Sequence, residues 1–214
     1  MINNFMTIVR FTMIEMLLFY YKNILLQKGK IKMDNLNEKL IKTCENFGAT
    51  NARIINIDQI IFNRQMREWC EDNVCGHYGK NYACPPAAGT IDELINKVKQ
   101  YSHALIIQTI SEINNFEDTA DYDDALEFHN MIMIEIRDTM DEMNIDNHAI
   151  GGGHCRICDM CACLYGGKCK SPQKAMVSLS AYCIDVGKLA TTCGLKYVKN
   201  SETVTYFGLI LFND

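Results

Sequence analysis

Proline, long apolar runs and excess positive charge are all scarce in this sequence. Three prolines and 13 glycines in 214 residues do not give the composition of a long disordered linker. The formal net charge of −5 argues against a nucleic-acid-binding protein, because such proteins neutralise phosphates with a basic surface. Hydrophobic residues make up 48% of the chain, which is ordinary for a globular protein that buries its core without disulfides.

Several signatures of catalysis and cofactor binding are missing as well. The sequence contains no Rossmann glycine fingerprint, and Gly151-Gly152-Gly153 lacks the Lys-Ser/Thr pair that completes a P-loop. No Ser/His arrangement points to a nucleophilic enzyme, and no repeat of the solenoid type is present. The sequence therefore leaves open whether the protein is an enzyme, and it shows no independent catalytic motif.

Residues 1–32 form a separate compositional block with a net charge of +4, against −9 for the rest of the chain. Their apolar run from Met16 to Tyr21 is too short to span a bilayer, and no small-residue cleavage site follows it. A basic amphipathic membrane anchor is one interpretation. We favour a disordered extension or a start assigned too far upstream, with Met33 as the alternative start. The prediction is an extension over 1–32 and a metal-binding domain over 33–214, in a cytoplasmic protein without membrane or nucleic-acid partners.

The order of periodic segments predicts an α+β fold, with mixed α/β as the alternative, in which helices flank a single sheet of four or five strands. Thr90 and Glu93 have the spacing of a capping box at the start of a helix. A stripe from Ala125 through Phe128 to Met140 predicts a long core-facing helix. The expected helices are 34–47, 91–101, 121–144 and 178–192. Ser178 is expected to cap the last of these, and Asp58 to cap a further short helix. The expected strands are 52–57, 103–110, 145–150, 195–199 and 203–212, and the last two are expected to form a hairpin that turns at Asn200-Ser201.

Cysteine, in contrast, is abundant. The 11 cysteines are an odd number, so they cannot all pair within one chain, and without a secretory signal an oxidising compartment is unsupported. Reduced cysteines serve as small buried hydrophobes, as metal ligands or as redox catalysts. The scattered Cys44 and Cys193 suit burial, whereas two clusters along the chain suit metal ligation.

The denser cluster, CRICDMCACLYGGKC, spans residues 155–169. Cys155, Cys158 and Cys161 form two consecutive Cys-x-x-Cys steps, which place three thiolates on one face of a compact loop. That spacing suits three corners of a cubane iron–sulfur cluster. We expect Cys169 to be the fourth ligand, because the intervening Gly166-Gly167 allows the chain to turn back.

Two alternatives remain for this cluster. Cys163 is a weaker ligand candidate, since it lies only two residues after Cys161 and joint ligation needs a sharp bend. Zinc is the alternative metal, although structural zinc sites usually use two separated Cys-x-x-Cys pairs rather than a tandem triplet. His154 is placed to join a mixed site.

The second cluster, Cys70, Cys75 and Cys84, lies in WCEDNVCGHYGKNYACPP, where glycines and Pro85-Pro86 favour a shaped loop over a helix. It also suggests metal ligands, with buried thiols or a redox pair as alternatives. A fourth ligand is not evident, and the candidates are Cys163, Cys183, His77 or an exogenous group. Four cations beside the two clusters are expected to lower thiol pKa values: Lys80, Arg156, Lys168 and Lys170. Two tyrosines, Tyr78 and Tyr82, are expected to shield a cluster from water.

Four segments of the chain together resemble one family: CGHYGKNYACPPAAGTIDEL, HCRICDMCACLYGGKCKSPQKA, SLSAYCIDVGKLA and TVTYFGLILF. It is the "predicted metal-binding protein" family of bacteria and archaea, domain of unknown function 2284, and the resemblance runs from about Met33 to the C-terminus. It implies metal binding through Cys75, Cys84, Cys155, Cys158, Cys161 and Cys169, with Cys70 as a further family position. Cys183 departs from the family pattern, where glycine is expected, and Cys163 lies outside it.

The sequence therefore predicts an iron–sulfur protein with one or two 4Fe-4S clusters and an electron-transfer or redox accessory role beside an unidentified redox partner protein. The alternatives are a zinc-stabilised interaction module, in which the cysteines only hold loops together, and a metallochaperone or metal sensor with exchangeable ligands.

Overall fold

The computed structural model describes residues 33–113, 119–197 and 202–213. The chain divides into two compact units, residues 1–40 and 41–214, and the sheet and the cysteine clusters belong to the second. The first described element is a helix over residues 33–46, which ends as predicted before Gly48, whose φ is +97°. Asp34 and Asn35 already lie inside this helix, so neither caps it. The predicted extension over 1–32 lies outside the described residues.

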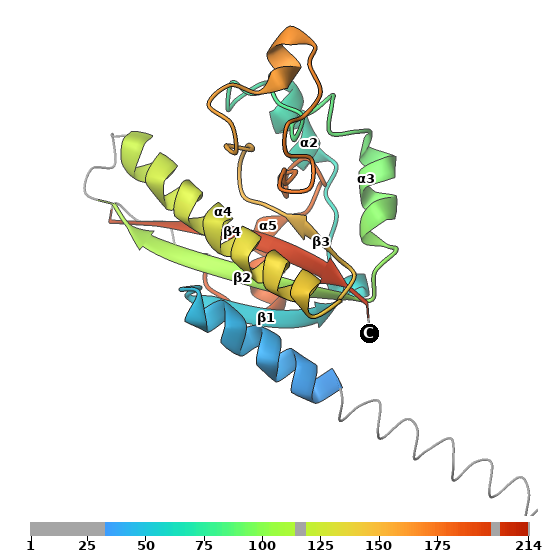
Figure 1. Ribbon diagram of the computed structural model, residues 1–214, viewed down its shortest axis with the longest axis vertical. Helices are drawn as coiled ribbons and strands as arrows, with labels where there is room; N and C mark the ends of the chain where they lie inside the picture. Colours follow the sequence, from blue (N-terminus) through green and yellow to red (C-terminus); the bar gives the residue numbers. More distant parts are fainter. Residues whose placement is uncertain (1–32, 114–118, 198–201, 214) are drawn as a thin grey trace, which may run out of the picture. The chain divides into compact units, whose positions relative to one another are not determined.

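The α+β prediction is confirmed, with a four-stranded sheet in the order β1-β2-β4-β3 (Figure 1). The strands are β1 (Asn51–Asn56), β2 (His103–Glu112), β3 (Asn147–Ile150) and β4 (Thr203–Phe212), and all neighbours are antiparallel. The predicted hairpin of 195–199 with 203–212 is wrong. Residues 195–197 are not a strand, and the strands that pair with β4 are β2, along residues 203–212, and β3, along residues 209–212. Residues 198–201 of that prediction lie outside the described part.

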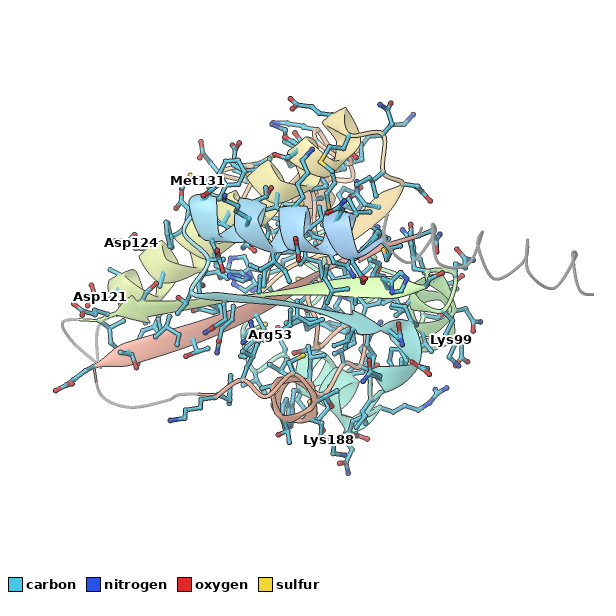
Figure 2. All side chains as sticks on the ribbon, turned by 90° about the horizontal axis from the view of Figure 1, so that it is seen from below. Arg53, Lys99, Asp121, Asp124, Met131 and Lys188 are labelled. Carbon is cyan, nitrogen blue, oxygen red and sulfur yellow. The ribbon has the colours of Figure 1, made fainter. Side chains whose placement is uncertain are left out.

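Helices lie on both faces of the sheet: Figure 2 shows Met131 on α4 (Thr119–Glu142) and Lys188 on α5 (Val186–Thr192) on opposite sides of the strands. On one face, Thr109 of β2 shares a 2.9 Å hydrogen bond with His129 of α4. On the other, alternate residues of β2 and β4 join a core with α3 (Ile91–Val98) and α5. This two-sided cover explains why residues 104–109 of β2 are buried in succession, as the sequence predicted.

Helix α3 starts as predicted at the Thr90 capping box, where the Thr90 amide donates to Glu93 Oε2 at 2.8 Å, and it ends at Val98 rather than at Tyr101. The short 3₁₀ helix η1 (Ile57–Gln59) has Asn56, not Asp58, as its N-cap. Each correction moves a helix boundary by a few residues only.

The predicted helix from Ser178 is wrong in its first half. Residues 179–183 form turns, Cys183 has a φ of +60°, and Ile184 makes an isolated β-bridge with Phe62. Helix α5 begins only afterwards, with Asp185 as its N-cap accepting from the Lys188 amide at 3.1 Å. A left-handed residue and a bridge to a distant segment both prevent a continuous helix here.

The long helix α4 confirms the predicted element and alters its buried face. Met133 and Met140 are fully buried core residues, as expected from a methionine-rich stripe. Phe128, placed in that stripe by the sequence, is 41% exposed, and His129 is fully buried instead, where its ring bonds to Thr109. No helix in the described residues combines the length and apolar character needed to cross a bilayer.

Candidate metal centre

The two cysteine clusters lie side by side at one end of the second unit, seen in Figure 1 as the orange segment beside α2 (Gln65–Glu71) and the turns that follow it. We call residues 70–84 the first loop and residues 155–169 the second loop. Asn81 Nδ2 donates to the Cys155 carbonyl at 2.8 Å, and the Tyr82 hydroxyl donates to the Gly167 carbonyl. The rings of His77 and His154 stack with centroids 3.5 Å apart. The loops therefore form one structural region.

The first loop begins inside a helix, which corrects the expectation of a loop throughout. Cys70 lies in the last turn of α2, and the loop then turns at Asn73, whose side chain accepts from the Tyr78 amide at 2.9 Å. Arg67, buried on the same helix, donates to the carbonyls of Ala181 at 3.1 Å and Gly89 at 2.8 Å. These bonds attach the start of the first loop to segments far away in the sequence.

The second loop turns back on itself as predicted. It contains the 3₁₀ helix η2 (Ala162–Tyr165), which ends at Gly166 with a φ of +72°, a left-handed conformation that glycine adopts without strain. The Gly167 amide then donates to the Ala162 carbonyl at 3.0 Å. This reversal returns the chain toward Cys161 and carries Cys169 with it.

The four predicted ligands of the second loop surround one small cavity of about 20 Å³, whose lining includes Cys155, Cys158, Cys161 and Cys169. Asn81 and Tyr82 of the first loop complete part of its wall. Cys163 is not among the described residues that line it, and its Sγ lies 3.7 Å from the Gly79 carbonyl instead. The geometry thus separates Cys163 from the other four cysteines of the loop.

Cys155 is the thiol of this cavity whose charged form is disfavoured in the absence of a cation. Burial raises the pKa of the Cys155 thiol, the hydrogen bond from the Ile157 amide lowers it by the next largest amount, and the charges of Cys161, Cys169 and Cys158 raise it by smaller amounts. A buried thiol of this kind becomes a stable thiolate when a metal cation neutralises it, with release of its proton. Such sulfur donors suit zinc or iron–sulfur groups.

The side chains also limit how a metal is held. Among the described residues, no three His, Cys, Asp or Glu side chains stand close enough together to hold a metal ion as a group. Binding of one ion therefore requires side-chain rotation, whereas a cluster of several metal atoms holds its thiolates further apart. The assignment of individual ligands stays a prediction.

The first loop faces a much larger cavity of about 470 Å³, whose lining includes Cys70, Cys75 and Cys84. Cys75 is exposed, whereas Cys84 is buried. Burial raises the pKa of Cys84 to about 12, and the charges of Cys75 and Cys70 and then of two second-loop cysteines, Cys155 and Cys161, act in the same direction. Cysteines of both loops therefore lie close enough to Cys84 for their charges to raise its pKa.

The sequence offered Cys163, Cys183 and His77 as a fourth ligand of the first loop. Burial raises the pKa of Cys70 most, and the charges of Cys75 and then of Cys183 raise it further. Cys183 is the one of the three candidates that acts on Cys70 in this way. Cys183 is fully buried, and its φ of +60° lies in the region that favours glycine, which gives a physical reason for the glycine expected at this family position. His77 stacks on His154, and Cys163 faces Gly79.

The predicted cations have mixed placements. Arg156 pairs with Asp123 of α4 at 2.5 Å, and Lys170 lines the small cavity. Burial lowers the pKa of His77, and the charge of Lys80 lowers it further. The cation that lowers the pKa of Cys70 is Arg67, which sequence reasoning missed. Its three-residue spacing from Cys70 becomes informative only when 65–71 is known to be a helix.

The tyrosines divide between the two cavities, with Tyr82 at the small one and Tyr78 at the large one.

In a comparison with protein families, a family model described as "Predicted metal-binding protein (DUF2284)" matches residues 53–212. The matched range includes every predicted ligand and begins later than Met33. Searches of the curated proteins and of the solved structures found no significant match.

Proposed function

The chain belongs to the DUF2284 family of predicted metal-binding proteins, and we propose that its second loop holds an iron–sulfur cluster. One observation carries the proposal: four cysteines of the loop line a single cavity, and the fifth, Cys163, faces elsewhere. The tandem Cys-x-x-Cys steps favour a cubane cluster, because they supply three thiolates from a short loop and leave the fourth to a more distant cysteine.

When bound, such a group supplies a centre that gains and loses single electrons. The residues of the chain define its surroundings. The Tyr82 hydroxyl bonds to the Gly167 carbonyl, so its ring is held at the wall of the small cavity and limits the entry of water. Asn81 fixes the backbone at Cys155 by the hydrogen bond to its carbonyl.

The outer surface of the second loop supports a redox accessory role. It exposes several large apolar side chains close to the cysteines: Ile157, Met160, Leu164 and Tyr165. Lys168 and Lys170 lie in the same segment. Exposed apolar groups of this kind commonly mark protein interaction sites. We therefore propose that a redox partner protein docks over the second loop and exchanges electrons there.

Zinc is the second candidate, and the small volume of the cavity favours it. About 20 Å³ accommodates one small ion more readily than a cube of iron and sulfide. A tetrahedral zinc ion with bonds of about 2.3 Å would draw the four sulfurs together and hold the loop as a structural module. The two candidates differ in iron and sulfide content, so composition distinguishes them directly.

The test is purification of the full chain without oxygen, followed by determination of iron, acid-labile sulfide and zinc per chain. The proposal predicts a brown protein with iron and sulfide in equal amounts and an electron paramagnetic resonance signal after reduction. A colourless protein with one zinc per chain and no sulfide would refute the iron–sulfur proposal and leave the zinc module.

A further inference from the structure

The large cavity beside the first loop has the dimensions of a small-molecule site. Its volume of about 470 Å³ falls within the range typical of ligand pockets, roughly 300 to 1,000 Å³. It is far larger than three thiols and a metal require. Cys70, Cys75 and Cys84 line one part of it, and residues from β4, from the segment after β3 and from residues 178–180 line much of the rest. The structure therefore provides space for an organic molecule beside these cysteines.

The wall of this cavity is rich in aromatic rings: Trp69, Tyr78, Tyr122, Tyr197, Tyr206 and Phe207. Two of the rings are supported by neighbours. The ring of Tyr197 lies 5.8 Å from that of Phe207, and the Tyr206 hydroxyl donates to the Tyr122 carbonyl at 3.1 Å. Aromatic side chains favour planar aromatic ligands, because ring faces and edges attract one another beyond the gain from burial.

The described residues that line the cavity offer a charged ligand no carboxylate, ammonium or guanidinium partner, and His154 is the only imidazole among them. Among the described residues that line it, none is Asp, Glu, Lys or Arg. Ser178, Ser180 and the tyrosine hydroxyls provide polar groups that orient a ligand by hydrogen bonds. A charged ligand would lose hydration here without compensation, so the chemistry of the wall selects a neutral molecule.

We propose that this cavity binds a neutral, planar aromatic molecule against the face formed by Cys70, Cys75 and Cys84. This inference goes beyond the proposed cluster in the second loop and does not depend on it. The ligand lies next to the exposed Cys75 and the buried Cys84, both of which line the cavity.

The test uses one aromatic ring system in two charge states: riboflavin, which is neutral, and flavin mononucleotide, which carries a phosphate. Each is titrated by calorimetry into the full chain purified without oxygen, and the fluorescence of Trp69, the single tryptophan of the chain, is followed in parallel. We expect saturable binding of riboflavin with quenching of Trp69, and binding of the phosphate form weaker by more than about tenfold. Absence of saturable riboflavin binding, or equal binding of both forms, would overturn the inference.

Two variants locate the binding to this cavity. Tyr197 on its wall and Tyr165 on the second loop are exposed to a similar degree, 56% and 58%. Tyr197→Ala is expected to weaken riboflavin binding about two- to tenfold, and Tyr165→Ala to leave it unchanged. An equal effect of both variants would place the binding elsewhere. Metal content measured on the same samples keeps the two proposals separate, because riboflavin binding to a protein without iron contradicts only the cluster proposal.

Discussion

The two cysteine loops use the same side chain and enclose very different spaces. The second loop folds back through η2 and Gly166, so four of its five cysteines surround about 20 Å³. The first loop leaves α2 and spreads its cysteines along one side of a cavity of about 470 Å³, with Cys75 exposed. The comparison indicates that the second loop is suited to enclose a bound metal group, whereas the first loop leaves whatever binds beside it accessible.

Loss of a second-loop ligand is expected to have the largest effect. Cys158→Ser should remove most of the iron and sulfide, because three remaining thiols leave the closed site incomplete. Metal and sulfide analysis after anaerobic purification measures this. The matched control is Cys193→Ser, which changes a half-buried cysteine at the end of α5 and should keep the content of the unchanged protein. Retention of full metal by Cys158→Ser would remove Cys158 from the ligand set.

A first-loop substitution should have a smaller effect. Cys75→Ser is expected to leave the iron of the second loop and its visible absorption in place, and to lower total metal only by what the first loop holds. The same analysis together with the absorption spectrum measures this. If Cys75→Ser empties the protein as completely as Cys158→Ser, the two loops form one site and the contrast between them fails.

The contact between the loops can be weakened on its own. Asn81 is buried, and its side chain donates to the Cys155 carbonyl at 2.8 Å and accepts from the Ala83 amide at 2.9 Å. Asn81→Ala should lower the free energy of unfolding by about 1 to 3 kcal/mol, since it leaves buried groups unpaired. Urea denaturation measures the change. The control is Asn63→Ala, which removes one exposed hydrogen bond, from the Gln65 amide to the Asn63 side chain, and should lower the free energy of unfolding by about 0.5 kcal/mol. Equal losses of stability in the two variants would mean that Asn81 does not join the loops.

The buried His129 of α4 should make stability depend on pH, because burial lowers the pKa of its ring from 6.5 to about 4. The folded state therefore holds His129 neutral, and stability is present above pH 6.5 and lost as the pH falls toward 4. This one group should cost about 2 kcal/mol of unfolding free energy at pH 5 relative to pH 8.

His129→Gln removes the group that takes up the proton. The free energy of unfolding of the variant should therefore differ less between pH 5 and pH 8, by about 2 kcal/mol, than that of the unchanged protein. Urea denaturation at the two pH values measures the difference. His148, whose pKa burial also lowers to about 4, remains in both proteins and contributes equally. Identical pH dependence in the variant and the unchanged protein would contradict a neutral, buried His129.

Features fixed by neighbouring residues could be predicted from the sequence. The Thr90–Glu93 capping box, the turn at Gly166 and the exclusion of Cys163 from the other four cysteines follow from short spacings. Each depends on hydrogen bonds or chain reversal within a few residues, so nothing distant can easily override it.

Features that depend on distant segments could not be predicted. The late start of α5 follows from the Phe62–Ile184 bridge, and the approach of the two loops from a bond between Asn81 and Cys155, residues 74 positions apart. The large cavity has the same origin, because its rings come from α2, α4, β4 and the residues that precede β4. Such contacts leave no periodic or local trace in the sequence.

We propose that four cysteines of the second loop hold the metal and that the fifth, Cys163, does not. Iron and sulfide per chain in Cys169→Ser and Cys163→Ser, purified side by side without oxygen, test it most directly. The cavity lining predicts that Cys169→Ser loses most of both and that Cys163→Ser matches the unchanged protein. Loss of iron and sulfide in Cys163→Ser with full retention in Cys169→Ser would contradict the account.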